Sequence, residues 1–209
     1  LLLGRSGAPK VDQHSASGRG LLPFCQRLPA IAWAVMLFAA FEGMVLTLLP
    51  IYGLQQGFTQ QEALLMASVV VIGDALLQLP LGWLADRLSR RLLFAGCGLV
   101  LTLSSLAIPP LLHEPAIWPV LVLFGASAGG LFTLALIMIG EHFRDDALVR
   151  ANAHVAQLWG LGCLVGPLLT GAATQWLTGH ALPLLMALGA AGFVVVVWRR
   201  PPFAQDQKA

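Results

Sequence analysis

Six long stretches of apolar residues alternate with short polar connections along the chain. They are Ile31–Tyr52, Glu62–Leu84, Leu92–Leu112, Ile117–Gly140, Asn152–Thr174 and Ala181–Trp198. A spanning helix needs about 20 mostly apolar residues to cross a hydrocarbon core of about 30 Å. The pattern therefore predicts an all-α membrane protein with six transmembrane helices.

Composition supports lipid as the solvent of most of the chain. Of 209 residues, 57% are hydrophobic and only 11% are charged, whereas about a quarter of the residues in soluble domains are charged. Six spans with short connections occupy most of this length, so the chain has no room for a large soluble domain. We expect a six-helix bundle over residues 30–200, between a cytoplasmic linker at 1–29 and a cytoplasmic tail at 201–209.

Lysine and arginine are restricted to alternate connections and to the two ends. They are Arg5, Lys10, Arg19 and Arg27 before the first span, Arg87, Arg90 and Arg91 after the second, Arg144 and Arg150 after the fourth, and Arg199, Arg200 and Lys208 after the sixth. The connections 53–61, 113–114 and 175–180 contain none. The positive-inside rule then predicts a multi-pass protein of the cell (inner) membrane with both termini in the cytoplasm.

These cations are needed for membrane topology, so the net charge of +2 does not indicate a nucleic-acid partner. The lipid bilayer is the expected partner instead. Cys25, Cys97 and Cys163 lack metal-ligand spacing, and we expect no metal and no cofactor. Because the chain begins with Leu1 rather than Met, and about 25 polar and small residues precede the first span, we expect the linker to follow an earlier part of a longer protein.

The second cytoplasmic connection has an unusual density of charge. It reads Gly82-Trp83-Leu84-Ala85-Asp86-Arg87-Leu88-Ser89-Arg90-Arg91. Arginines alone would satisfy the topology, but Asp86 and Gly82 are not needed for it. An acid beside three bases can form ion pairs that hold helices together, and a glycine lets two helices approach closely. This connection is therefore a candidate latch.

The same ten residues resemble the signature loop of the major facilitator superfamily, Gly-x-Leu-Ala-Asp-Arg-x-Gly-Arg-Arg/Lys. Nine of ten positions agree, counting the two free ones, and the exception is Ser89 in place of a glycine that accepts positive φ. The resemblance implies a cytoplasmic gating motif made of Gly82, Asp86, Arg87, Arg90 and Arg91. Its candidate latch partners at the other cytoplasmic turn are Glu141, Arg144 and Arg150.

Two further stretches are similar to the same superfamily. Leu49–Tyr52 with Gly57–Thr59 resembles its first external turn, and Thr59 with Glu62 predicts a capping box. The fifth span contains Gly160, Gly162, Gly166, Pro167 and Gly171, similar to the Gly-Pro motif of many exporters. Gly162 and Gly166 form a GxxxG pair, so we favour helix packing there, with a hinge at Pro167 as the alternative.

The resemblance covers Phe41 to about Arg200, which is six spans where the family has twelve in two related halves. The fourth span lacks the arginine that first halves of this family often carry. These features imply the carboxy-terminal half of a twelve-helix bundle, with the missing N-terminal six-helix half as its partner. They also imply secondary active transport of a small solute by alternating access.

Two carboxylates and an amide inside the predicted spans are candidate site residues. Glu42 is near the middle of the first span and Asp74 near the middle of the second, with Gln78 one turn beyond. A charged group at mid-bilayer costs about 2.5–3.5 kcal/mol on insertion scales, so these side chains should face a cavity or the bundle interior. We expect proton coupling or contact with a polar or cationic solute, and the alternative is polar contact that stabilises helix packing.

Two other functions are consistent with parts of the sequence. Gly125-Ala126-Ser127-Ala128-Gly129 spells G-x-S-x-G, as in serine hydrolases, and rhomboid-type intramembrane proteases also have six spans. Such a serine needs a histidine base, and Ala181–Trp198 contains none, so small residues for helix packing are the favoured interpretation and we expect no enzyme. A non-transporting membrane scaffold or accessory subunit is the other alternative.

Overall fold

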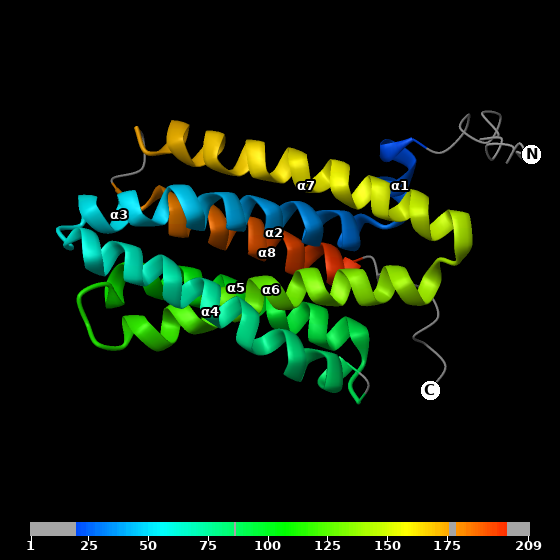
Figure 1. Cartoon of the computed structure of the whole chain (residues 1–209), viewed down its shortest axis with the longest axis horizontal. Coiled ribbons are helices and arrows are strands. Elements are labelled where there is room, and N and C mark those ends of the chain that lie inside the picture. The colour runs from blue at the N-terminus through cyan, green and yellow to red at the C-terminus, as the bar shows by residue number, and fades with distance from the viewer. Residues whose placement is uncertain (1–19, 86, 176–178, 200–209) are drawn as a thin grey trace, which may run out of the picture.

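The computed structural model describes residues 20–85, 87–175 and 179–199. Within these residues the chain forms eight helices and no strand (Figure 1). The helices are α1 (Leu21–Arg27), α2 (Pro29–Thr47), α3 (Leu49–Gln55), α4 (Gln60–Ala85), α5 (Arg90–Leu111), α6 (Ile117–His142), α7 (Asp145–Ala173) and α8 (Ala181–Arg199). Each of the six predicted stretches coincides with one of the long helices or, for the first, with a pair.

The first predicted stretch is divided at Leu48 into α2 and α3. Pro50 lies in the first turn of α3, where its missing N–H and fixed φ are tolerated, whereas inside a continuous helix it would remove a hydrogen bond. The seventh helix also differs from expectation, because it begins at Asp145 rather than near Asn152. Asp145 and Asp146 in its first turn interact favourably with the helix dipole and extend it.

A short helix lies inside the stretch assigned to the linker. Helix α1 buries Phe24 and is followed by the buried Leu28. It lies against α2 and the beginning of α7. The ordered bundle therefore includes residues that precede the first span.

Five helices, α2, α5, α6, α7 and α8, are long and apolar enough to cross a membrane. Helix α4 has 26 residues, the same length as α6. All of them run along the long axis of the molecule (Figure 1). The protein is accordingly an all-helical, multi-pass membrane protein.

Three pairs of helices pack most extensively, namely α4 with α6, α2 with α7, and α5 with α8. Glycines mark the closest approaches. A Cβ built on Gly125 of α6 would overlap the backbone oxygen of Val70 in α4, and one on Gly166 of α7 would lie 2.7 Å from the Cα of Ala40 in α2. Small residues thus bring backbones together, which is how helices associate closely in lipid.

Aromatic rings fill the space between α2, α6 and α7. Phe38 stacks on Phe132 at a centroid distance of 4.9 Å, and both rings meet the edge of Trp159. Phe41 meets Phe124 at 4.9 Å on the next turn. Such pairs are stabilising beyond the area that they bury, so they fix the relative positions of these three helices.

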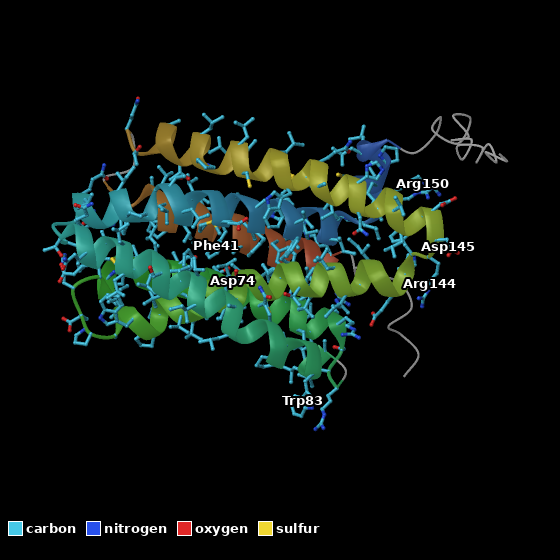
Figure 2. All side chains as sticks on the ribbon, in the orientation of Figure 1. Phe41, Asp74, Trp83, Arg144, Asp145 and Arg150 are labelled. Carbon is cyan, nitrogen blue, oxygen red and sulfur yellow. The ribbon has the colours of Figure 1, made fainter. Side chains whose placement is uncertain are left out.

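The two ends of the bundle differ in charge. The described arginines lie in or beside the helix ends that gather at one end of the bundle (Figure 1), called here the basic end; they are Arg27, Arg87, Arg90, Arg91, Arg144, Arg150 and Arg199. Figure 2 labels Arg144 and Arg150 there. The opposite end is held by contacts without Lys or Arg, including 2.9 Å between the Tyr52 hydroxyl and His180 Nδ1. This separation is the spatial form of the one-sided charge pattern in the sequence.

Candidate functional site

An ion pair at the basic end joins the start of α5 to the end of α6. Arg90 Nη2 donates to Glu141 Oε1 at 2.6 Å, with side chains 19% and 53% exposed. Glu141 is one of the three partners expected for the gating motif. Neither Arg144 nor Arg150 makes an ion pair within the described residues.

The turn between α4 and α5 is formed without a left-handed residue at Ser89. Ser89 is the N-cap of α5, with φ −61° and ψ 131°, and its hydroxyl accepts a hydrogen bond from Leu92 N at 3.3 Å. An extended N-cap with a hydroxyl satisfies a backbone donor that glycine would leave open. The replacement of glycine by serine therefore does not strain this turn.

Two other arginines of the motif contact tryptophans. The Arg87 guanidinium lies 3.9 Å from the centre of the Trp83 ring. Arg91 Nη2 donates to the backbone oxygen of Trp198 at 2.6 Å, and its guanidinium lies 5.4 Å from that ring. Arg91 thereby ties the start of α5 to the end of α8.

The other two members of the motif are Asp86 and Gly82. Asp86 lies outside the described residues. A Cβ built on Gly82 would meet no heavy atom of the described residues within 4 Å, so Gly82 makes no close helix contact inside the described part of this chain, and its role in the motif stays a prediction. On the same helix, α4, the close approach to α6 occurs instead at Gly73, where an added Cβ would lie 2.9 Å from the Cα of Val122.

Asp74 of α4 (labelled in Figure 2) lies against a glycine of α6, Gly129. A Cβ built on Gly129 would overlap Asp74 Oδ1, so only glycine leaves room for the carboxylate in this position. Gln78 Nε2 donates to the same Oδ1 at 3.3 Å, as their spacing of one turn predicts. Asp74 is half-buried, and Gln78 is exposed.

Glu42 lies on α2 and is half-buried, as is Asp74 on α4, and these two helices contact each other. The flanking Phe41 packs into the aromatic cluster of α2, α6 and α7. Neither carboxylate forms an ion pair with an Arg, Lys or His in the part of the chain that the structure describes. The two carboxylates therefore lie on contacting helices, without a basic partner among the described residues.

Gly162 and Gly166 of the fifth span face α2, whereas a Cβ built on Gly160 or Gly171 would meet no described heavy atom within 4 Å. A Cβ on Gly162 would lie 2.6 Å from Met36 O, and the Pro167 ring would be 3.2 Å from a Cβ on Gly43. Pro167 lies inside the continuous helix α7. These positions are those of a packing surface.

The G-x-S-x-G sequence lies in the contact between α6 and α4. Ser127 is 3% exposed, and its hydroxyl donates to its own helix, at Phe124 O, at 3.1 Å. The flanking Gly125 and Gly129 contact Val70 and Asp74. The small residues serve helix packing, and Ser127 has no base at hydrogen-bond distance among the described residues.

Some contacts in this arrangement were not predicted from the sequence. Gly73 was not singled out, and only the packing shows that a Cβ built on it would lie against the backbone of Val122 in α6. The acceptor for Arg91 is a backbone oxygen, that of Trp198, and no residue type could have signalled it. Glu141, the partner of Arg90, was predicted only as one of three candidate partners of the motif.

Comparisons with known proteins agree with the motif. Residues 31–209 match the family model described as Major Facilitator Superfamily. An uncharacterized MFS-type transporter of Yersinia enterocolitica is 28% identical over 167 residues, covering 78% of this chain and 43% of that protein. The uncharacterized MFS-type transporter YcaD of Escherichia fergusonii is 28% identical over 145 residues, covering 69% and 37%. The chain thus spans about two fifths of the length of these relatives.

Proposed function

Because the chain belongs to the Major Facilitator Superfamily, a family of membrane transporters and not of enzymes, we propose that it is the carboxy-terminal half of a proton-coupled secondary transporter. In this proposal α4 is the sixth span beside the five other long helices, and the missing N-terminal six-helix half completes a twelve-helix bundle. A small solute is carried by alternating access between the two halves. The coverage of about two fifths of each relative and the absence of arginine from α6 support this assignment.

The pair of carboxylates carries the proposal of proton coupling. Glu42 and Asp74 lie on contacting helices and lack a basic partner within the described residues. A carboxylate in a membrane interior is stabilised when a proton or another cation neutralises it. A carrier that loads and releases such a cation on opposite sides gains a driving force for its solute.

The basic end supports a gate. We assign the latch role to Arg90 with Glu141, and a supporting role to Arg87 and Arg91, whose contacts hold the ends of α4 and α8. Exposed ion pairs contribute about 1 kcal/mol or less, so such a latch can open within a transport cycle. Gly82, open within this chain, is available to the other half.

Orientation follows from the same end. In the proposal the basic end faces the cytoplasm, as the positive-inside rule requires, and both termini lie on that side of the cell (inner) membrane. Labelling of a single cysteine placed at Arg87 or Arg144 from outside intact cells would contradict it.

The function is tested in the full-length transporter that contains this chain. The protein is reconstituted in vesicles with a pH-sensitive dye inside, and proton movement is recorded while cationic and neutral solutes, ethidium among them, are added. Glu42→Gln and Asp74→Asn should each abolish or strongly reduce solute-dependent proton movement. Glu114→Gln, in the connection between α5 and α6, removes a carboxylate outside the bundle and is the matched control.

Two results would contradict the proposal. If both variants moved protons like the parent protein, the carboxylates would be polar contacts between helices. If the full-length protein moved no solute and no protons, a non-transporting membrane subunit would be the remaining interpretation.

A further inference from the structure

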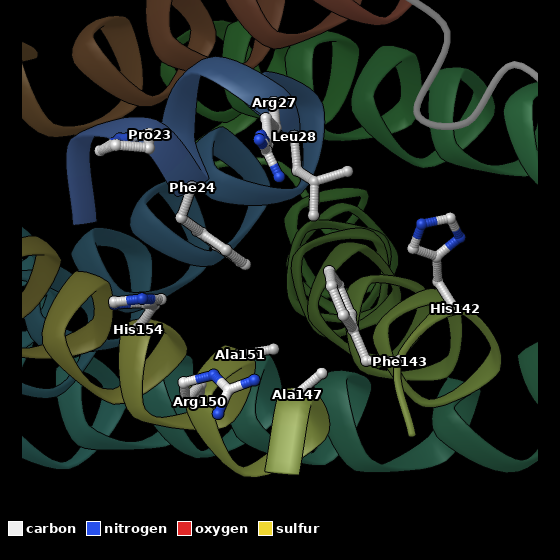
Figure 3. A pocket seen from close by; sticks show the side chains of 10 residues that line it. All are labelled: Pro23, Phe24, Arg27, Leu28, His142, Phe143, Ala147, Arg150, Ala151 and His154. Atoms are coloured by element: carbon white, nitrogen blue, oxygen red, sulfur yellow. The ribbon is translucent and has the colours of Figure 1, made fainter. Parts of the chain in front are cut away.

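A pocket of about 150 Å³ opens at the basic end, between α1 and the turn that joins α6 to α7 (Figure 3). Helix α1 forms one wall, and the first turns of α7 form the opposite wall. Its lining residues are Pro23, Phe24, Arg27, Leu28, His142, Phe143, Ala147, Arg150, Ala151 and His154. The volume accommodates several water-sized groups.

The polar lining of this pocket carries only groups that are basic. Arg27 comes from α1 and Arg150 from α7, on opposite sides of the space, and His142 and His154 add two imidazoles (Figure 3). No acidic side chain is among the lining residues. Both guanidiniums are exposed, and neither forms an ion pair with a described acidic side chain. Two fixed positive charges facing one space favour an anion there.

The rest of the lining is apolar, and the two helices that form the pocket also carry exposed apolar side chains. Phe24, Leu28 and Phe143 form the apolar walls. Leu22 and Val149, each next in sequence to a lining residue, are 70% and 69% exposed. These helix ends stand where the spans leave the hydrocarbon, at the depth of lipid headgroups and upper acyl chains.

We propose that this pocket binds the headgroup phosphate of an anionic phospholipid. The phosphate lies between Arg27 and Arg150, since arginine forks match phosphate oxygens, and the acyl chains leave across Leu22 and Val149. Basic pockets between helix ends bind lipid headgroups of this type. The bound lipid joins α1 to α7, which otherwise share few contacts. This binding goes beyond transport and does not depend on the carboxylates or the latch.

The test measures lipid binding to the purified 209-residue chain in detergent by native mass spectrometry. The chain is titrated with phosphatidylglycerol and, separately, with the neutral phosphatidylcholine. Phosphatidylglycerol should bind more tightly, and the double variant Arg27→Gln/Arg150→Gln should weaken its binding by about 30-fold, since each basic residue near a membrane surface contributes about a factor of five. Arg144→Gln removes an exposed arginine from the same turn but not from the pocket, and should leave the affinity nearly unchanged.

A charge-retaining double variant, Arg27→Lys/Arg150→Lys, guards against a folding defect and should keep most of the affinity. Equal binding of the two lipids, or unchanged phosphatidylglycerol binding by the glutamine double variant, would overturn the proposal. A third titration adds glycerol 3-phosphate, which carries the same phosphate without acyl chains. If it displaces the lipid at equal concentration, the pocket accepts a free phosphate ester and the assignment to a lipid is wrong.

Discussion

Replacing Gly125 by alanine tests a close backbone contact between two of the described helices. The new methyl group would overlap the backbone oxygen of Val70, and it would lie 2.8 Å from the carbonyl carbon and 3.0 Å from Asp74 N. All three atoms are backbone, so no side-chain rotation relieves the overlap. Helices α4 and α6 must therefore move apart along the most extensive contact in the bundle.

The expected effect is the difference between two opposing terms. Overpacking typically costs about 1–3 kcal/mol, and a backbone contact belongs at the upper end. Alanine is about 1 kcal/mol more favourable than glycine inside a helix, which offsets part of this cost. The net loss of about 2 kcal/mol lowers the melting temperature by about 4–8 °C for a chain of this size.

Gly82→Ala is the matched control, because Gly82 lies in a long helix with open space at its Cβ position. This substitution adds only the higher helix propensity of alanine, with no overlap, and should raise the melting temperature by about 2–4 °C. Thermal unfolding of the purified chain in detergent, followed by circular dichroism, measures both. Equal melting temperatures for Gly125→Ala and Gly82→Ala would refute the close contact between α4 and α6.

Three further predictions concern the basic end, the opposite end and α1. Arg90→Glu and Glu141→Arg should each lower the melting temperature by about 2–4 °C, from an ion pair of about 1 kcal/mol, and the exchanged pair should regain most of the loss; additive losses would contradict the contact. Thr59→Ala removes an N-cap whose hydroxyl and backbone N–H both bond Glu62, and should cost about 1 kcal/mol in the same assay, whereas Thr59→Ser should not. Burial raises the pKa of the Cys25 thiol above its ordinary value, an effect partly opposed by a backbone hydrogen bond. At pH 8 its thiolate fraction is therefore smaller in the folded chain than in the denatured chain, and N-ethylmaleimide should react more slowly by mass spectrometry. The two rates should converge at a pH above both pKa values, and equal rates at pH 8 would contradict the burial.

The sequence predicted the positions of the long helices because apolar length and one-sided charge are each dictated by the bilayer. The capping box of Thr59 and Glu62 is confirmed for a similar reason, since its partners are three residues apart. The contact partners of glycines were harder to predict. Gly82 was expected at a helix contact but faces open space, whereas Gly125 makes the contact. A glycine shows where helices can approach, and only the packing of the whole bundle decides where they do.

Asp74 and the Arg90–Glu141 ion pair are connected through the same helix. Asp74 sits on Gly129 of α6, and Glu141 ends α6 about 18 Å further along its axis at 1.5 Å per residue. Because α4 and α6 touch backbone to backbone at Gly125, sliding of one helix past the other is resisted, and a displacement at Asp74 moves both helices together. The ion pair joins α5, through Arg90, to α6, through Glu141. A movement of α4 and α6 relative to α5 therefore changes the distance between these two side chains. If Asp74 changes charge in the proposed transport cycle, the close contacts of α4 with Gly125 and Gly129 of α6 are the structural connection from it to the basic end.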